Sequence, residues 1–166
     1  DANEAAGVIK NTMQDATQTP FAFEGLLAAN KALISAGVNS EDARKDVLNL
    51  SNAIAATGGG DDELNRMVVN LQQIRNTGKA TAMDIKQFAF AGVNIYAVLA
   101  AAGVKLGEGQ DATYEQITMA LKKAHDKGGI YFNGLENMAN ATSVKISNLG
   151  DAFFQLNVKI FNYFKP

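Results

Sequence analysis

The sequence predicts an all-α fold: a compact array of about seven short-to-medium helices, followed by a longer amphipathic C-terminal helix. Apolar residues recur every three or four positions, and no alternation with a period of two is sustained. Only two prolines occur among the 166 residues. Glycine follows six of the apolar segments, as expected of helix-ending residues in the left-handed conformation: Gly37, Gly58, Gly78, Gly92, Gly103 and Gly128.

The first three predicted helices lie within residues 19–78 and each carries one apolar face. Residues that cap or open helices mark their starts, namely the Thr19-Pro20 pair, Asn39 or Ser40, and Asp61 as N-cap. The core is expected to include one or more large apolar residues from every face: Leu26, Leu33, Leu50, Ile54, Leu64, Leu71, Ile74, Ile85, Phe88, Leu99, Ile117 and Leu121.

Three further helices are predicted between residues 81 and 128. Two begin with capping boxes, Thr81-x-x-Asp84 and Thr113-x-x-Gln116, in which Asp84 replaces the usual Glu or Gln. Asn94 caps a short helix between them. Because the connections are short, successive helices should pack as antiparallel neighbours within one domain, residues 1–142.

Residues 143–166 form a separate amphipathic segment. Its apolar residues are spaced 3, 4, 3, 4 and 3 positions apart, which is the seam of a heptad repeat and a candidate association face: Ile146, Leu149, Phe153, Leu156, Ile160 and Tyr163. Three interpretations stay open. The helix packs back onto the domain, it begins a coiled-coil rod that self-associates, or it lies at a membrane interface, for which its three lysines form too small a basic face.

The residues predict no enzyme, cofactor or metal site. There is no cysteine, and His125 is the only histidine, which excludes a His-rich zinc site. It falls near a helix C-terminus, where an imidazole suits the helix dipole. Gly58-Gly59-Gly60 leads into three acidic residues, which would repel a phosphate. The net charge of -2 and the lack of a basic stripe indicate no direct DNA binding, and no apolar stretch is long enough to span a membrane.

The run from Lys79 to Tyr96, KATAMDIKQFAFAGVNIY, resembles the signature block of bacteriophage tail tape measure proteins. Flanking pieces resemble the same family in the same order from about residue 5 to 154, and one departure is Asn94, where the family commonly has proline. The residues that carry the resemblance are Gly78, Thr81, Asp84, Gln87, Phe88, Gly92, Tyr96, Gly128, Gly129, Thr142, Leu149 and Asp151.

The resemblance implies a structural role. It makes the chain one domain of a longer virion protein that sets tail length during assembly in the host cytoplasm and leaves the tail during DNA ejection. It implies tail tube protein and tail assembly chaperones as partners, and no small-molecule substrate. The alternative is a free-standing helical module that binds a partner helix in an exposed apolar groove.

Overall fold

The computed structural model describes residues 2–106, 111–141, 153, 156–157 and 159–160. Within these ranges the chain is all-α, as predicted, and its one strand-like pairing is an isolated antiparallel bridge between Ala80 and Ala112. The helices of the described part are α1 (Ala2–Gln18), α2 (Phe23–Ser35), α3 (Ser40–Ala56), α4 (Asp61–Thr77), α5 (Ala82–Phe90), α6 (Ile95–Ala101), α7 (Tyr114–His125) and α8 (Gly134–Ala141).

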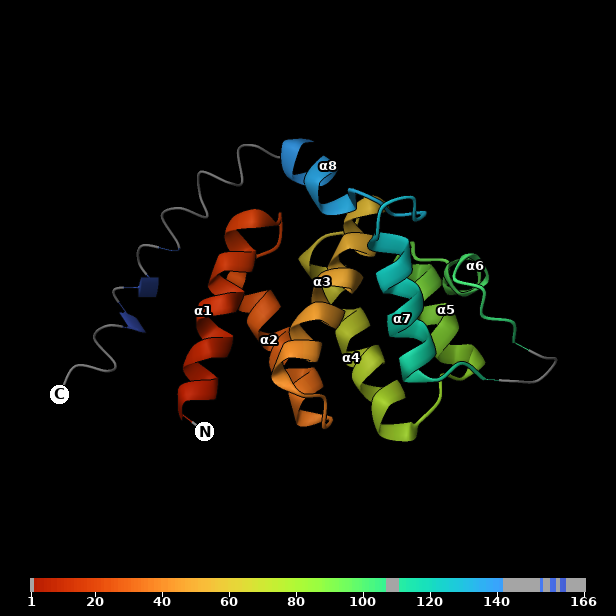
Figure 1. Cartoon of the computed structure of the whole chain (residues 1–166), viewed down its shortest axis with the longest axis horizontal. Helices are drawn as coiled ribbons and strands as arrows, with labels where there is room; N and C mark the ends of the chain where they lie inside the picture. The colour runs from red at the N-terminus through yellow and green to blue at the C-terminus, as the bar shows by residue number, and fades with distance from the viewer. Residues whose placement is uncertain (1, 107–110, 142–152, 154–155, 158, 161–166) are drawn as a thin grey trace.

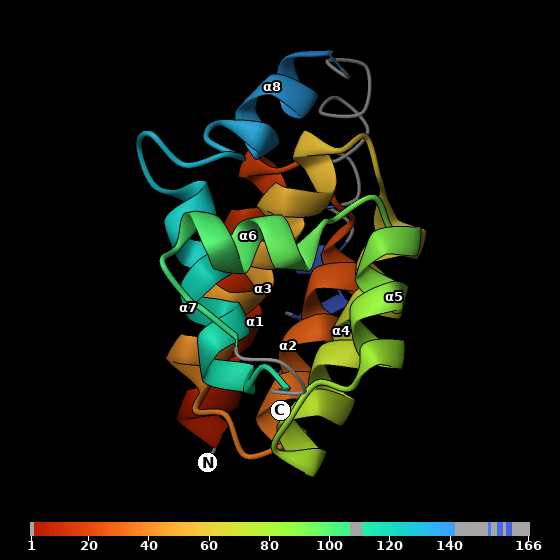
Figure 2. The same ribbon diagram turned by 90° about the vertical axis from the view of Figure 1, so that its right-hand side faces the viewer.

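Helix α3 is the centre of the array. It packs against α1, α2, α4, α7 and α8, while α2 also packs against α1 and α4. Figure 1 shows α1 at one end of the molecule, α5 and α6 at the other, and α8 across one end of α3. In Figure 2, α6 crosses in front of α7, on which it packs, and α5 runs alongside α4. The two short helices α5 and α6 therefore form one outer end of the domain.

Four predicted helix starts are confirmed, whereas the Thr19-Pro20 pair does not cap α2, whose N-cap is Ala22. Asn39, Thr81, Asn94 and Thr113 each accept a hydrogen bond from the backbone N–H three residues ahead. The prediction of Asp61 as an N-cap is wrong, since Gly60 is the N-cap of α4. The Gly60 N–H donates to Glu63 Oε2 over 2.8 Å, which is the half of a capping box that a glycine permits.

Asp61 instead joins two helices. Its Oδ1 accepts a hydrogen bond of 3.0 Å from the backbone N–H of Ala22, the residue that precedes α2. Ala22 has no side-chain cap of its own. The carboxylate of Asp61 therefore satisfies an N–H at the start of α2 from the first turn of α4.

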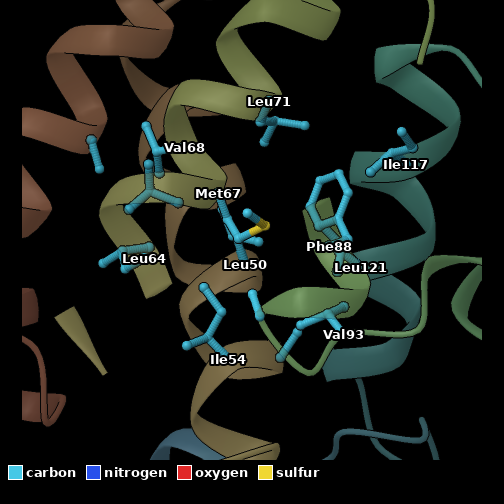
Figure 3. Packing of buried hydrophobic residues seen from close by; sticks show 14 of the residues in the cluster. Leu50, Ile54, Leu64, Met67, Val68, Leu71, Phe88, Val93, Ile117 and Leu121 are labelled. Atoms are coloured by element: carbon cyan, nitrogen blue, oxygen red, sulfur yellow. The ribbon is translucent and has the colours of Figure 1, made fainter. Parts of the chain in front are cut away.

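The predicted glycines follow the ends of the helices. All six lie in the left-handed region, with φ between 81° and 86°. The predicted core is also confirmed, because all twelve of its residues are buried. Figure 3 shows its middle, where α3, α4, α5 and α7 converge on Leu50, Met67, Leu71, Phe88 and Ile117.

Two helices, α1 and α8, were not predicted. Helix α1 buries only Met13 and Ala16 among its apolar residues, so its apolar pattern is weak. It is held to α3 by a bidentate ion pair, in which Arg44 Nε and Nη2 lie 2.7 and 2.6 Å from the Asp15 carboxylate. Helix α8 has eight residues and begins at Gly134, a residue type that disfavours helix interiors.

The predicted longer C-terminal helix falls mostly outside the described residues, which include none of Ile146, Leu149 and Tyr163. The other three members of the candidate association face, Phe153, Leu156 and Ile160, are helical, partly buried and packed against the domain core. These three contacts favour packing back onto the domain.

Replacing Leu156 with Asp should lower the free energy of unfolding by about 1–3 kcal/mol, because a charge would replace an apolar side chain that packs on the core. The matched control is Asn157→Asp, since Asn157 is exposed on the same turn. Urea denaturation of the full chain compares the two. Equal stability, with Leu156→Asp changing only the oligomeric state, would instead support association between copies through this face.

Candidate interaction surface on helices α5 and α6

The block from Lys79 to Tyr96 runs from the turn after α4, through α5, to the first turn of α6. Thr81 and Asp84 hold the start of α5. The Thr81 N–H and Oγ1 donate to Asp84 Oδ2 over 2.7 and 2.8 Å, and the Asp84 N–H points back to Thr81 Oγ1 at 3.4 Å. Asp84 is buried, and its carbonyl oxygen accepts a hydrogen bond of 3.0 Å from Asn70 Nδ2 on α4. Thr81 and Asp84 therefore start α5 and bind it to α4.

Three further residues that carry the resemblance are structural. Gly78 ends α4 with a φ of 85°. The Phe88 side chain is fully buried, in the core view of Figure 3. Gly92 has a φ of 84°, and a Cβ there would lie 3.2 Å from the Thr57 side chain. Gly92 thus combines a left-handed turn with a close approach to the end of α3.

The remaining two residues that carry the resemblance in this part of the chain, Gln87 and Tyr96, face solvent. Gln87 is exposed on α5, and Tyr96 on α6 is 57% exposed. Two more apolar side chains of α5 are exposed as well, Met83 by 62% and Phe90 by 76%. Large exposed apolar side chains gathered on two neighbouring helices are typical of a binding surface. Residue type alone does not separate these outward residues from the structural ones.

A groove adjoins this surface. It lies between α5, α6 and the segment after α6, and has a volume of about 770 Å³. Its lining is mostly apolar and includes Ile85, Tyr96, Leu99, Val104 and Leu106, with Lys105 and Asp111 as its charged residues. The groove is comparable in volume to small-molecule sites, at ~300–1,000 Å³. The described lining is largely apolar, so the groove suits apolar side chains.

The other glycines that carry the resemblance, Gly128 and Gly129, form the turn after α7. Gly128 has a φ of 86°, and a Cβ on Gly129 would lie 2.3 Å from the carbonyl oxygens of Lys123 and Ala124. Gly129 therefore permits the chain to pass against the end of α7. Thr142, Leu149 and Asp151 lie outside the described residues.

A buried asparagine that the sequence did not single out holds this turn. Asn52 on α3 is fully buried; its Nδ2 donates to the Tyr131 carbonyl oxygen over 2.7 Å and its Oδ1 accepts from the Leu135 N–H over 3.1 Å. Both ends of the amide are used, so Asn52 fixes the turn and the start of α8 against α3. The signal in the sequence was the pair of asparagines, Asn49 and Asn52, among the apolar residues of α3.

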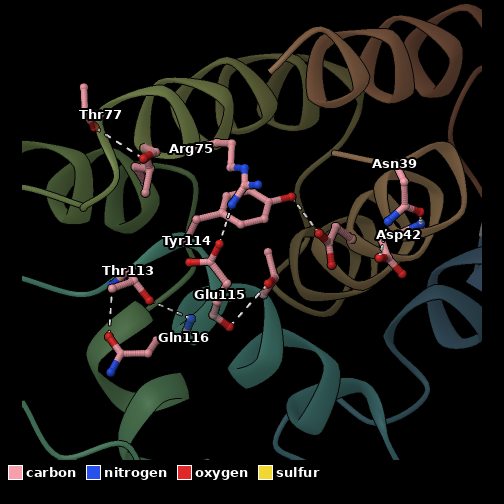
Figure 4. A network of polar contacts seen from close by, with 11 residues as sticks. Asn39, Asp42, Arg75, Thr77, Thr113, Tyr114, Glu115 and Gln116 are labelled. Carbon is pink, nitrogen blue, oxygen red and sulfur yellow. Dashed lines mark hydrogen bonds and ion pairs between the residues drawn. The ribbon is translucent and has the colours of Figure 1, made fainter. Parts of the chain in front are cut away.

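A polar cluster at the α3–α7 contact was missed too (Figure 4). Tyr114 Oη donates to Asp46 Oδ2 over 2.6 Å, and the Arg75 guanidinium lies over the Tyr114 ring, 5.3 Å from its centroid. Arg75 also pairs with Glu115. Burial raises the pKa of the Asp46 carboxyl from 3.8 to about 6, against the opposing effect of the Tyr114 hydrogen bond. The cluster joins α3, α4 and α7.

Replacing Asp46 with Asn should remove part of the pH dependence of stability. With its pKa raised, Asp46 binds its proton more tightly in the folded than in the unfolded chain. Its contribution to stability is therefore fully present below pH 3.8 and is lost as the pH rises through about 6. A rise from 3.8 to about 6 corresponds to about 3 kcal/mol.

The unfolding free energy of the wild-type chain should thus fall by about 2 kcal/mol relative to Asp46→Asn between pH 4 and pH 7. Urea denaturation of both proteins at both pH values measures this difference. Tyr114→Phe is the control, since it removes the hydrogen bond and keeps the carboxyl. Parallel pH curves for the wild-type and Asp46→Asn proteins would show that the carboxyl is not buried in this way.

His125 is the last residue of α7, the helix end where the sequence placed it. Its Nδ1 lies 2.8 Å from Asn49 Oδ1, and burial lowers its pKa, against the raising effect of Asp126. The lowered pKa disfavours the charged imidazole that the helix dipole would stabilise. Within the described ranges, no three His, Asp or Glu residues are grouped to hold a metal ion, and no helix there is long and apolar enough to cross a membrane.

Comparison with known proteins adds no relative. No family model, curated protein or solved structure matches the chain. The class of protein follows from the fold and the surface alone: an α-helical domain with an exposed apolar face.

Proposed function

We propose that the chain is a structural domain of a bacteriophage or prophage tail, part of a tape measure protein that sets tail length during assembly and is released during DNA ejection. The ordered resemblance of residues 5–154 supports the family. The observation that carries this role is the division of residues 79–96 between core and surface. Thr81, Asp84 and Phe88 build a rigid α5, and the same helix presents Met83 and Phe90 to solvent. This arrangement suits contact with other proteins.

The proposed partners are the tail tube protein and the tail assembly chaperones. A single helix with its side chains is ~10–12 Å across, and this domain packs five helices around α3. It is therefore wider than a single helical rod. We place the domain at an end of the tail, with the rod-like part of the longer protein in the tube lumen.

Mass spectrometry of purified virions tests this role. Peptides from residues 2–141 should be present in intact tails at a few copies per virion and depleted after DNA ejection. Empty heads from the same lysate are the control fraction. Absence of the peptides from intact tails would contradict the proposal.

A free-standing helical protein-interaction module is the second candidate. The exposed apolar face with its adjoining groove favours it, because neither feature requires a tail. In this case the chain would be found with a cytoplasmic partner in infected or lysogenic cells and not in virions. Tails assembled without the chain would then have normal length.

A further inference from the structure

Helix α5 has an outward stripe that its own domain does not cover. At 100° per residue, Met83, Lys86 and Phe90 lie within about 60° of one another on the helix surface. All three are exposed. The stripe lies next to the side of α5 that lines the groove, where Ala82 and Ile85 are found. Groove and stripe thus form one continuous surface, whose far wall is Tyr96 of α6.

The surface carries an unbalanced positive charge. Lys86 on α5 and Lys105 at the groove are exposed, and neither is in an ion pair in the part of the chain that the structure describes. The one described acidic residue of the groove lining, Asp111, is paired with Lys79 at 2.9 Å. The chain as a whole has a net charge of -2. Among the described residues, the charge of this surface is therefore positive on balance.

We propose that this surface binds an amphipathic helix of a partner protein, with apolar side chains in the groove and acidic side chains flanking them. Such a helix presents apolar anchors every three or four residues, and Met83 and Phe90 lie two turns apart on α5, with Met83 next to the groove-lining Ala82. Acidic residues beside the anchors would pair with Lys86 and Lys105. The inference concerns the partner's chemistry and does not depend on the tail function.

A protein helix fits this surface better than a membrane or a nucleic acid. Membrane-surface helices carry a continuous basic face, and nucleic-acid sites carry several cations that follow the phosphates. This surface has two unpaired lysines, and its apolar groups line a concave groove. A row of apolar side chains from a helix would fit in that groove.

The test is a selection on the full chain with displayed helical peptides of about 15 residues. Apolar residues are fixed at i, i+3, i+4 and i+7, and the remaining positions are randomised among Glu, Gln and Lys. Enriched peptides should carry an excess of Glu beside the anchors. Their affinity should fall more than about tenfold for Phe90→Ser and about threefold to tenfold for Lys105→Glu.

Matched variants control for surface changes in general. Met119→Ser removes an exposed apolar side chain from α7, and Lys31→Glu reverses an exposed charge on α2. Both should leave affinity unchanged. The proposal fails if no peptide is enriched above an uncoated support, if Lys is enriched beside the anchors, or if Phe90→Ser and Lys105→Glu bind as tightly as the wild type.

Two further outcomes would assign the surface to another class of partner. Flotation of the chain with phosphatidylglycerol vesicles that is lost in Phe90→Ser would indicate a lipid surface. Binding to a single-stranded oligonucleotide that is lost in Lys105→Glu would indicate a nucleic acid. Either result would overturn the assignment of a protein helix, whether or not the chain is found in virions.

Discussion

Gly129→Ala is expected to destabilise the domain by more than about 4 kcal/mol, which exceeds the effect of most substitutions. A Cβ at this position would lie 2.3 Å from the backbone oxygens of Lys123 and Ala124. Those oxygens cannot move away easily, because the Ala124 oxygen also accepts the Tyr131 N–H at 2.9 Å and Gly129 itself donates to Asp126 at 2.8 Å. The turn must therefore open, and with it the contact of α8 with α3.

The neighbouring glycine is the control. Gly128 has a φ of 86°, but a Cβ there would have no atom within 4 Å. Gly128→Ala should therefore show only the backbone strain of the left-handed conformation, about 1–2 kcal/mol. Urea denaturation of the two variants ranks them directly. If they lost equal stability, the close packing of residue 129 against the end of α7 would be wrong.

Phe88→Ala should lower the free energy of unfolding by about 3–5 kcal/mol, because it leaves a cavity where α3, α4, α5 and α7 meet. The Phe88 side chain is fully buried among their apolar residues (Figure 3). Phe90 is the same residue type, two positions along the same helix, and is 76% exposed. Phe90→Ala should change stability by less than about 0.5 kcal/mol.

Thermal and urea denaturation of both phenylalanine variants, with circular dichroism to check helix content, provides the measurement. The pair separates folding from binding, since Phe90→Ala should leave the fold intact and weaken the capture of helical peptides. A loss of several kcal/mol in Phe90→Ala would mean that the outer face of α5 is covered by the chain itself, and the interaction surface would not exist.

Local patterns in the sequence predicted much of the fold. The capping boxes at Thr81 and Thr113 and the turn glycines satisfy hydrogen bonds or φ angles within a few residues of themselves. Their conformation is therefore determined by residues that are close in the sequence. The start of α4 shows where such local patterns fail. Gly60 is its N-cap, and Asp61, which the sequence suggested, instead binds Ala22, 39 residues away.

Contacts between distant residues could not be predicted in this way. Asn52 and Tyr131 are 79 residues apart, and Asp46 and Tyr114 are 68 apart. Polar residues on a helix face look the same in the sequence whether they are solvated or clamp another element. For the same reason α1 escaped prediction, because Asp15 is buried through an ion pair with Arg44.

The candidate site was predicted as a segment but not as a surface. Residues 78–96 were singled out together, and the structure divides them into residues that build α5 and residues that α5 and α6 expose. Helical periodicity alone places Phe88 and Phe90 on different faces. It cannot say which outward residues adjoin a groove, because the groove also needs Val104 and Leu106 from the segment after α6.

Tail length is the most direct measurement of the proposed role. In the longer tape measure protein that the proposal implies, an in-frame deletion of about 60 residues of helix outside this domain should shorten the tail by ~90 Å, at 1.5 Å per residue. Electron microscopy measures tail length in the phage with the deletion, where the tail should be shorter, and in a phage with a matching duplication, where it should be longer. Lengths that follow the residue number would support the proposal. Tails of unchanged length in both phages would contradict it.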